Sequence, residues 1–207
     1  MGNPRYQNAF AVTLHPDVLT LPLRWRRPRR IFVNSMSDLF HEAVPEEFIR
    51  QVFEIMERAD WHVFQVLTKR SERLANLAPR LRWAPNIWQG VSVESARYTN
   101  RIDHLRTVPA GVRFLSIEPL LGAIPNVRLD DIDWVIVGGE SGAGRRSMAA
   151  SWARAIRDQC VRAGVPFFFK QWGGRTPRAG GRNLDCRTWD EMPTPLVSRT
   201  AGRFAGP

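Results

Sequence analysis

The stretch IWQGVSVESARYTNRIDHLRTVPAGVRFLSIEP, residues 87–119, contains one complete copy of the pattern that decides the fold. It opens with a short apolar run, Ile87–Val93, and continues into an amphipathic segment from about Ala96 to Arg106. A second apolar run, Val112–Ile117, closes it. Apolar runs of this length, rich in β-branched and aromatic residues, indicate buried strands. Two such strands joined by a helix predict a parallel βαβ unit.

The same alternation continues on both sides of this unit. Five further strands are predicted, at Phe10–His15, Ile31–Val33, Trp61–Leu67, Trp134–Val137 and Val165–Phe169. Helical spacing of apolar residues predicts helices from Pro45 to Arg58, from Ser71 to about Leu77, and from Ser151 to Ala163. Pro45 and Ser71 are suited to helix starts, and Gly164 is suited to a helix end.

Near-continuous apolar strands that alternate with helices indicate an α/β fold with a parallel sheet buried on both faces. An open doubly wound sheet and a (β/α) barrel both fit this order. Seven predicted strands favour the barrel, which takes eight, and no G-x-G-x-x-G turn supports a dinucleotide-binding sheet. We expect residues 1–175 to form the barrel domain. Residues 176–207 should form a tail with a short docked segment at Leu184–Met192.

The composition limits the class of protein. A chain of 207 residues is long enough for one domain with a sizeable core. Hydrophobic residues make up 43% and charged residues 24%, which are values of a globular chain. No apolar stretch is long enough to span a membrane, and the first residues lack the apolar region of a secretory signal. With only Cys160 and Cys186 present, we expect a cytoplasmic protein without disulfides.

The formal net charge of +10 raises the question of a nucleic-acid partner. Nearly all of the basic residues are arginines, and the only lysines are Lys69 and Lys170. Such a ratio more often reflects a GC-rich genome than a binding function. The densest basic run, Arg24–Arg30, is interpreted as a solvated connection into the next strand. Weak, sequence-independent binding of nucleic acid is the alternative.

Polar residues follow each predicted strand at the point where the strand ends. In a parallel barrel these ends surround one mouth, where the active sites of barrel enzymes lie. Any single one of these residues is explained equally well by the start of solvent at a strand end. Together they define a candidate site. The candidate catalytic residues are Lys69, Glu118 and Lys170, and the candidate ligand-binding residues are Asn34, Ser35, Asp38, Thr68, Ser92, Glu94, Ser116, Gly138, Gly139, Glu140, Ser141 and Gln171.

The two lysines and the Gly-rich loop indicate what kind of ligand such a site would take. Lysine offers a compact amine that arginine cannot replace, and both lysines fall at strand ends. A structural ion pair with a neighbouring glutamate is the competing interpretation. In the loop Gly138–Gly142, Glu140 would repel a bare phosphate, so a ligand amine or a ribose hydroxyl suits it better. No H-E-x-x-H, C-x-x-C or G-x-S-x-G motif occurs, and no metal ligand is predicted.

Several blocks resemble a known family, in the same order along the chain. They are LPLRWRRPRRIFVNSMSDLFHEAVP, FQVLTKRSERL, GVSVES, RFLSIEPLLG, DWVIVGGESG, VPFFFKQWG and LDCRTWDE. The chain thereby resembles the phage-associated family of unknown function known as the three-Cys-motif proteins. Full-length members look like radical S-adenosylmethionine enzymes. Their N-terminal cysteines, which end in C-x-x-C-Y-A, would hold a four-iron four-sulfur cluster.

The chain departs from this pattern because it begins after the cysteines. A cluster of this kind needs three closely placed thiolates, and Cys160 and Cys186 do not replace them. The resemblance therefore implies a radical-type barrel without its first strand and without a cofactor, not catalytically competent in this form. A late start codon, a truncated gene remnant, and a remnant retained for binding a nucleoside-like or other small ligand all remain open.

Two further expectations follow from this interpretation. A barrel without its first strand would expose strand edges at Phe10–His15 and Val165–Phe169, which predicts self-association through those edges. The rival function is that of a non-catalytic, nucleic-acid-associated phage protein, which would use Arg24–Arg30 and an exposed Trp25.

Overall fold

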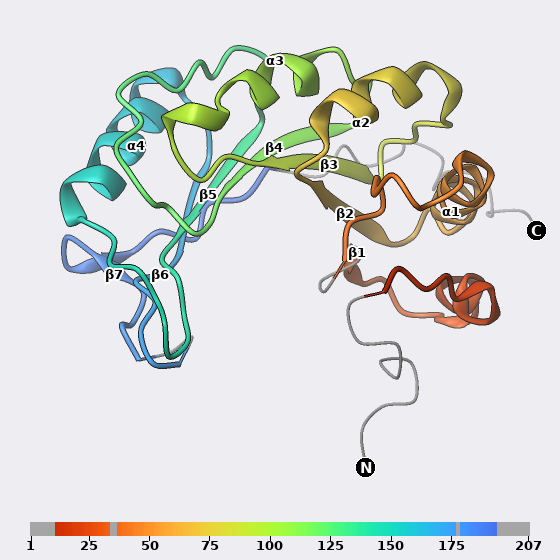
Figure 1. Cartoon of the computed structure of the whole chain (residues 1–207), viewed down its shortest axis with the longest axis horizontal. Helices are drawn as coiled ribbons and strands as arrows, with labels where there is room; N and C mark the ends of the chain where they lie inside the picture. Colours follow the sequence, from red (N-terminus) through yellow and green to blue (C-terminus); the bar gives the residue numbers. More distant parts are fainter. Residues whose placement is uncertain (1–10, 34–36, 177–178, 194–207) are drawn as a thin grey trace, which may run out of the picture.

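Six strands pair into one parallel sheet whose spatial order follows the sequence (Figure 1). The computed structural model describes residues 11–33, 37–176 and 179–193. Each strand hydrogen-bonds to the next one along the chain, and every pairing is parallel. The strands are β1 (Arg30–Val33), β2 (Val63–Thr68), β3 (Ile87–Ser92), β4 (Val112–Ile117), β5 (Trp134–Gly138) and β6 (Phe167–Gln171).

Four α-helices connect these strands and cover one face of the sheet, as Figure 1 shows. They are α1 (Glu46–Arg58), α2 (Ser71–Leu77), α3 (Asn100–Arg106) and α4 (Ala150–Ala163). Short 3-10 turns add η2 (Pro16–Val18), η3 (Leu21–Arg24), η4 (Ala78–Arg80) and η5 (Ala96–Tyr98). Because the strand order never reverses, the sheet curves into half of a (β/α) barrel and is not doubly wound. The α/β class and a partial barrel are thus confirmed.

The alternation of side chains along each strand separates two apolar clusters. On the face covered by helices, Phe64 and Val66 of β2 pack with Ile49 and Phe53 of α1 in the main core. On the opposite, concave face, four buried residues form a second cluster: Trp88, Val112, Phe114 and Trp134. Aromatic rings therefore fill much of the concave face between the amino and carboxyl ends of the central strands.

Local sequence signals account for the two longest helices. Pro45 precedes α1, and Glu46 and Glu47 occupy its first turn, where carboxylates favour the positive end of the helix dipole. The helix α4 ends at Gly164, which adopts a left-handed conformation with φ of 67° and donates its amide to Val161. Only glycine adopts that conformation at no steric cost, so the predicted helix end is confirmed.

The predicted strand at Phe10–His15 is wrong for its described part. Residues 11–15 form no strand and lead into η2, and Val12 and Leu14 remain exposed. This segment has a high β-propensity, but propensity yields a strand only when a neighbouring strand supplies hydrogen bonds and packing. The described residues therefore contain six strands in the parallel sheet, and β1 lies at its N-terminal edge.

The second edge predicted to be exposed, that of β6, is covered by another segment of the chain. The amide of Phe169 in β6 donates to the carbonyl of Trp189 at 2.8 Å, and Phe168 forms an antiparallel bridge with Asp190. A small hairpin of β7 (Asn183–Leu184) and β8 (Arg187–Thr188) leads into this contact, and its Leu184 is fully buried. The chain's own C-terminal segment thus covers most of the edge that the sequence left open.

Two local details differ from the sequence-based expectation. Ser71 does not cap α2, because its hydroxyl is paired with Nδ1 of His104 at 2.9 Å. The helix expected from about Ala96 to Arg106 is divided into η5 and α3. The Ser71–His104 contact joins α2 to α3. None of the helices in the described ranges has the length and apolarity needed to cross a bilayer.

Candidate functional site

The carboxyl ends of β2 to β6 form a polar rim above the aromatic cluster. The strand register aligns Ser92 of β3 with Ser116 of β4 and then with Ile136 of β5. Both serines belong to the concave face, and both are buried. The next position toward the rim on this face holds Glu94 after β3 and Glu118 after β4. Since side chains alternate along a strand, a row of hydroxyls lies directly below a row of carboxylates.

Asp38 organises the first part of this rim. Its Oδ1 accepts hydrogen bonds from the Thr68 hydroxyl at 2.7 Å and from the amide of Phe40. Its Oδ2 accepts from the backbone amide of Lys69 and from Arg70, both at 3.0 Å. Arg70 also pairs with Glu42. Asp38 is therefore a structural anchor that fixes the turn after β2 and holds the Lys69 backbone in place.

Lys69, Glu94 and Arg101 form the second part. Nζ of Lys69 lies 2.6 Å from Oε1 of Glu94, and Nη1 of Arg101 lies 2.9 Å from Oε2. The Glu94 side chain is only 8% exposed, whereas that of Lys69 is 55% exposed. Burial alone would raise the pKa of Glu94, and it is the largest single influence. Hydrogen bonds from Lys69 and from the backbone, with the charges of Lys69 and Arg101, outweigh burial and lower this pKa.

Glu118 and Lys170 form the third part, from β4 and β6, with β5 between them. Nζ of Lys170 donates to Oε2 of Glu118 at 2.9 Å. The intervening residue is Gly138, and a β-carbon there would approach the Glu118 carboxyl group to 3.1 Å. The absence of a side chain at position 138 thus leaves room for the carboxylate. The Lys170 side chain is 53% exposed, so its amine remains accessible to solvent.

The Gly-rich loop forms the fourth part. The amide of Gly139 donates to the carbonyl of Gln171, and the Gln171 side chain donates to the Ser141 hydroxyl at 3.1 Å. The backbone at Gly139 approaches the Trp172 carbonyl so closely that no β-carbon would fit. Glu140 binds Arg146 through both carboxylate oxygens. The hydrogen bonds from the Arg146 side chain, followed by the one from its backbone amide, lower the pKa of Glu140 to about 2.

The predicted site residues thus lie in four neighbouring groups at the carboxyl ends of the strands. Asn34 and Ser35 lie outside the described residues. Sequence reasoning missed Arg70, Arg101 and Arg146, each of which binds a predicted carboxylate. An arginine in so arginine-rich a chain has no individual signal. For Arg101, the sequence signal was its position shortly after Glu94, in the connection between a strand and the following helix.

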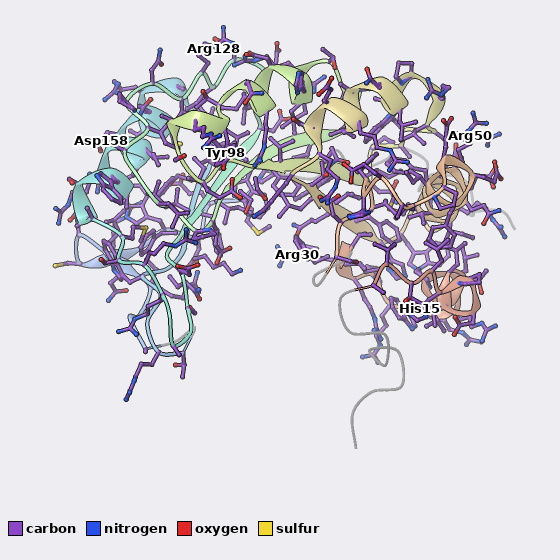
Figure 2. The ribbon with its side chains drawn as sticks, in the orientation of Figure 1. His15, Arg30, Arg50, Tyr98, Arg128 and Asp158 are labelled. Carbon is purple, nitrogen blue, oxygen red and sulfur yellow. The ribbon has the colours of Figure 1, made fainter. Side chains whose placement is uncertain are left out.

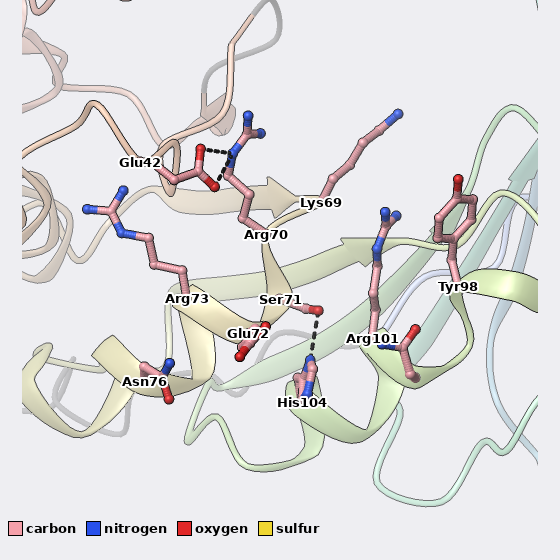
Figure 3. Close-up of a pocket in the computed structure, with 11 residues that line it drawn as sticks. Glu42, Lys69, Arg70, Ser71, Glu72, Arg73, Asn76, Tyr98, Arg101 and His104 are labelled. Atoms are coloured by element: carbon pink, nitrogen blue, oxygen red, sulfur yellow. Dashed lines mark hydrogen bonds and ion pairs between the residues drawn. The ribbon is translucent and has the colours of Figure 1, made fainter.

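A cavity of about 440 Å³ opens beside the second group, between α2 and α3 (Figure 3). Lys69, Arg101 and Tyr98 extend to the same side of it, and Arg101 stacks on the Tyr98 ring at 4.2 Å. The paired Ser71 and His104 form its base. The volume suits a small organic ligand. The cavity therefore extends the polar rim toward the helical face.

The cysteines do not suit an iron–sulfur cluster. Cys160 is buried in α4, where burial, with a smaller effect of Glu191, raises the pKa of its thiol to about 12. Cys186 is exposed in the turn between β7 and β8. Cluster ligands are thiolates held close together. Within the described ranges no three His, Cys, Asp or Glu side chains are grouped so that they could hold a metal ion.

Chemically, the rim offers carboxylates, half-exposed amines and hydroxyls on one strip of surface. The fold and the rim define the class of protein: an α/β half-barrel with a polar rim at the carboxyl ends of its parallel strands. Residues 1–193 match the family DUF5131, described as a protein of unknown function, and the chain belongs to that family. No curated protein and no solved structure matches the chain. Family membership assigns no activity, so the function is argued from the site.

Proposed function

We propose that the polar rim binds a small zwitterionic ligand, either a free amino acid or a nucleoside that carries one. The observation that carries this proposal is the two lysine–glutamate contacts at the carboxyl ends of the strands: Lys69–Glu94 joins β2 and β3, and Lys170–Glu118 joins β4 and β6 across β5. Each pair offers a cation for a ligand carboxylate and an anion for a ligand amine. Ser92 and Ser116 lie directly below these pairs.

The exposure of the two lysines supports exchange with a ligand. Both amines are about half exposed, whereas their glutamates are largely covered. Each lysine amine is solvated, so it can turn from its glutamate to a ligand carboxylate without losing contact with water. The glutamate, held in place by its surroundings, then accepts the ligand amine. Glu118 and Lys170 are the central residues of this proposal, with Lys69 and Glu94 beside them.

The family resemblance adds one specific candidate, S-adenosylmethionine, which combines an amino acid, a ribose and an adenine. For full-length relatives the resemblance implies a phage-associated radical enzyme with a four-iron four-sulfur cluster. In this proposal, the present chain supplies the ligand-binding half-barrel and holds no cluster. The positions of Cys160 and Cys186 support that view. Anaerobic reconstitution with iron and sulfide should give no charge-transfer absorbance, and stoichiometric uptake of four irons would contradict it.

Isothermal titration calorimetry tests the ligand class directly. The probes are methionine, S-adenosylmethionine and adenosine, each titrated into the purified chain. We expect the two ligands with an amino-acid group to bind, and adenosine to bind more weakly. Lys170→Met and Glu118→Gln should each weaken binding about tenfold or more, because each removes one charge-assisted hydrogen bond. Glu57→Gln, in the distant surface pair with Arg82, is the matched control and should leave binding unchanged.

Two results would overturn the proposal. The first is equal affinity for adenosine and for the zwitterionic probes, which would remove the role of the paired charges. The second is unchanged methionine binding in both Lys170→Met and Glu118→Gln, with thermal unfolding showing that both variants are folded. The control variant separates these outcomes from a general effect of surface charge.

A further inference from the structure

Five arginines lie within seven residues from the end of η3 to the start of β1: Arg24, Arg26, Arg27, Arg29 and Arg30. All five are exposed. We call this segment the Arg24–Arg30 surface. It lies at the amino ends of β1 and β2, since Arg30 is aligned with Val63 at the start of both strands. The polar rim lies at the opposite ends of the strands, so this surface is separate from the proposed ligand site.

The Arg24–Arg30 surface differs from most of the described molecule because several neighbouring arginines there lack acidic partners. Elsewhere, most of the described arginines, on α1, α3 and α4 and on the connecting segments, form ion pairs: Arg50, Arg70, Arg80, Arg82, Arg101, Arg106, Arg128, Arg146, Arg154, Arg157, Arg182 and Arg187. Among the described residues, none of the five arginines of this surface pairs with a carboxylate. Arg29 stacks on Trp25 at 4.6 Å, and Arg30 contacts the sulfur of Met192.

Uncompensated charges at this density carry a cost. Five guanidinium groups in seven residues repel one another, and this repulsion destabilises the folded chain slightly. On the remaining surface the same chain places a carboxylate beside most of its arginines. A polyanion that binds here would remove the repulsion. The charge distribution therefore indicates an anionic polymer as the partner, and a solvated connection does not explain the contrast.

Aromatic rings are fixed beside these arginines. The indole nitrogen of Trp61 donates to the carbonyl of Trp25 at 2.7 Å, and both rings pack against His62. Trp61 remains 38% exposed. A rigid indole next to arginines can stack on a nucleobase, as aromatic residues do in proteins that bind single strands. Because these rings are held by the protein, they are poorly suited to deep insertion into a membrane.

We infer that the Arg24–Arg30 surface binds single-stranded nucleic acid, with arginines on phosphates and Trp61 on a base, without sequence preference. The binding is weak and strongly salt-dependent, because the contacts are mainly with the phosphate backbone. Figure 2 shows Arg30 well separated from Tyr98, which lines the cavity at the other end of the sheet. A strand bound here therefore leaves the polar rim accessible.

The test is fluorescence anisotropy with a labelled single-stranded DNA of mixed sequence, about two dozen nucleotides long, over a range of salt concentrations. For single strands, the logarithm of affinity falls with the logarithm of salt with a slope of about −0.7 per phosphate contacted. The variant carries Arg24→Gln, Arg26→Gln and Arg27→Gln. Loss of three contacts should make the slope less steep by about 2 and weaken binding at least tenfold at low salt.

The matched control carries Arg58→Gln, Arg145→Gln and Arg162→Gln. These three arginines are also exposed and form no ion pair among the described residues, so both triple variants lose the same charge. The control should keep the wild-type slope. Equal loss in both variants would mean that only the net charge matters and would overturn the inference. So would tighter binding to vesicles with anionic phosphatidylserine than to DNA at the same salt, or no binding at all. Methionine binding should be unchanged in both variants, which separates this result from the proposed ligand site.

Discussion

Replacement of Glu94 by alanine tests whether buried paired charges in the polar rim stabilise the fold. Glu94 accepts from Lys69 at 2.6 Å and from Arg101 at 2.9 Å, and its own side chain is 8% exposed. Removal of one partner from a buried ion pair costs about 3–5 kcal/mol in general. Here Lys69 can return to water, while Arg101, only 15% exposed, keeps one hydrogen bond to the carbonyl of Ser92. We therefore expect Glu94→Ala to cost about 2–3 kcal/mol.

For a chain of this length, that cost corresponds to a fall in Tm of roughly 5–10 °C, measured by differential scanning calorimetry. Glu46 provides the matched control, because it also binds two basic side chains, Arg50 and Arg80, but does so in solvent. Glu46→Ala should lower Tm much less, since exposed pairs contribute little. If the two variants lower Tm by the same amount, burial is not what makes Glu94 important, and the reasoning fails.

Three further predictions concern other parts of the structure. Gly139→Ala should prevent stable folding, because its β-carbon would collide with the Trp172 carbonyl, whereas Gly144→Ala meets no atom within 4 Å and should be neutral; soluble expression and circular dichroism compare the two. Cys186 should react with iodoacetamide at pH 8 while Cys160, buried and with a pKa raised to about 12, should not, and mass spectrometry of the labelled peptides would show a reversed order if this is wrong. The folded chain lowers the pKa values of Glu94, Glu140 and Asp185, so in acid the unfolded chain binds more protons than the folded one. The midpoint of urea unfolding should therefore be highest above pH 4.5 and fall as the pH approaches 2. A midpoint that rises as the pH is lowered from 5 to 3 would contradict this prediction.

Much of the fold could be predicted from sequence because its central strands are largely buried on both faces. Runs such as Val112–Ile117 are mostly apolar, and the structure places β4 over the same residues. Phe10–His15 has equally suitable residues but no partner strand in its described part, and no local pattern records that difference. The contact of residues 189–190 with the edge of β6 could not be predicted either, because it joins a strand to a segment that lies outside the strands and has no strand pattern of its own.

The candidate site shows the same division. Lys69 and Lys170 could be predicted as site residues because lysine is rare in this chain, and both lie in ion pairs at strand ends. Their partners could be guessed only as a class, because the identity of a partner depends on strand order. The order β4–β5–β6 places Lys170 across from Glu118 with a glycine between them. Arg101 could not be singled out from the many other arginines in the sequence, although its charge helps to lower the pKa of Glu94.

The sequential strand order affects how local unfolding of one strand influences the others. In a closed barrel the first and last strands are neighbours, so any two strands communicate by two routes around the ring. In the described sheet, β1 and β6 are the ends of a row, and within the sheet each strand pairs only with its immediate neighbours. Loosening at β1 therefore reaches β6 only by passing through every strand between them. We therefore expect the β1 end to open more readily than the part of the sheet that holds the Glu118–Lys170 pair, as in a linear array of elements.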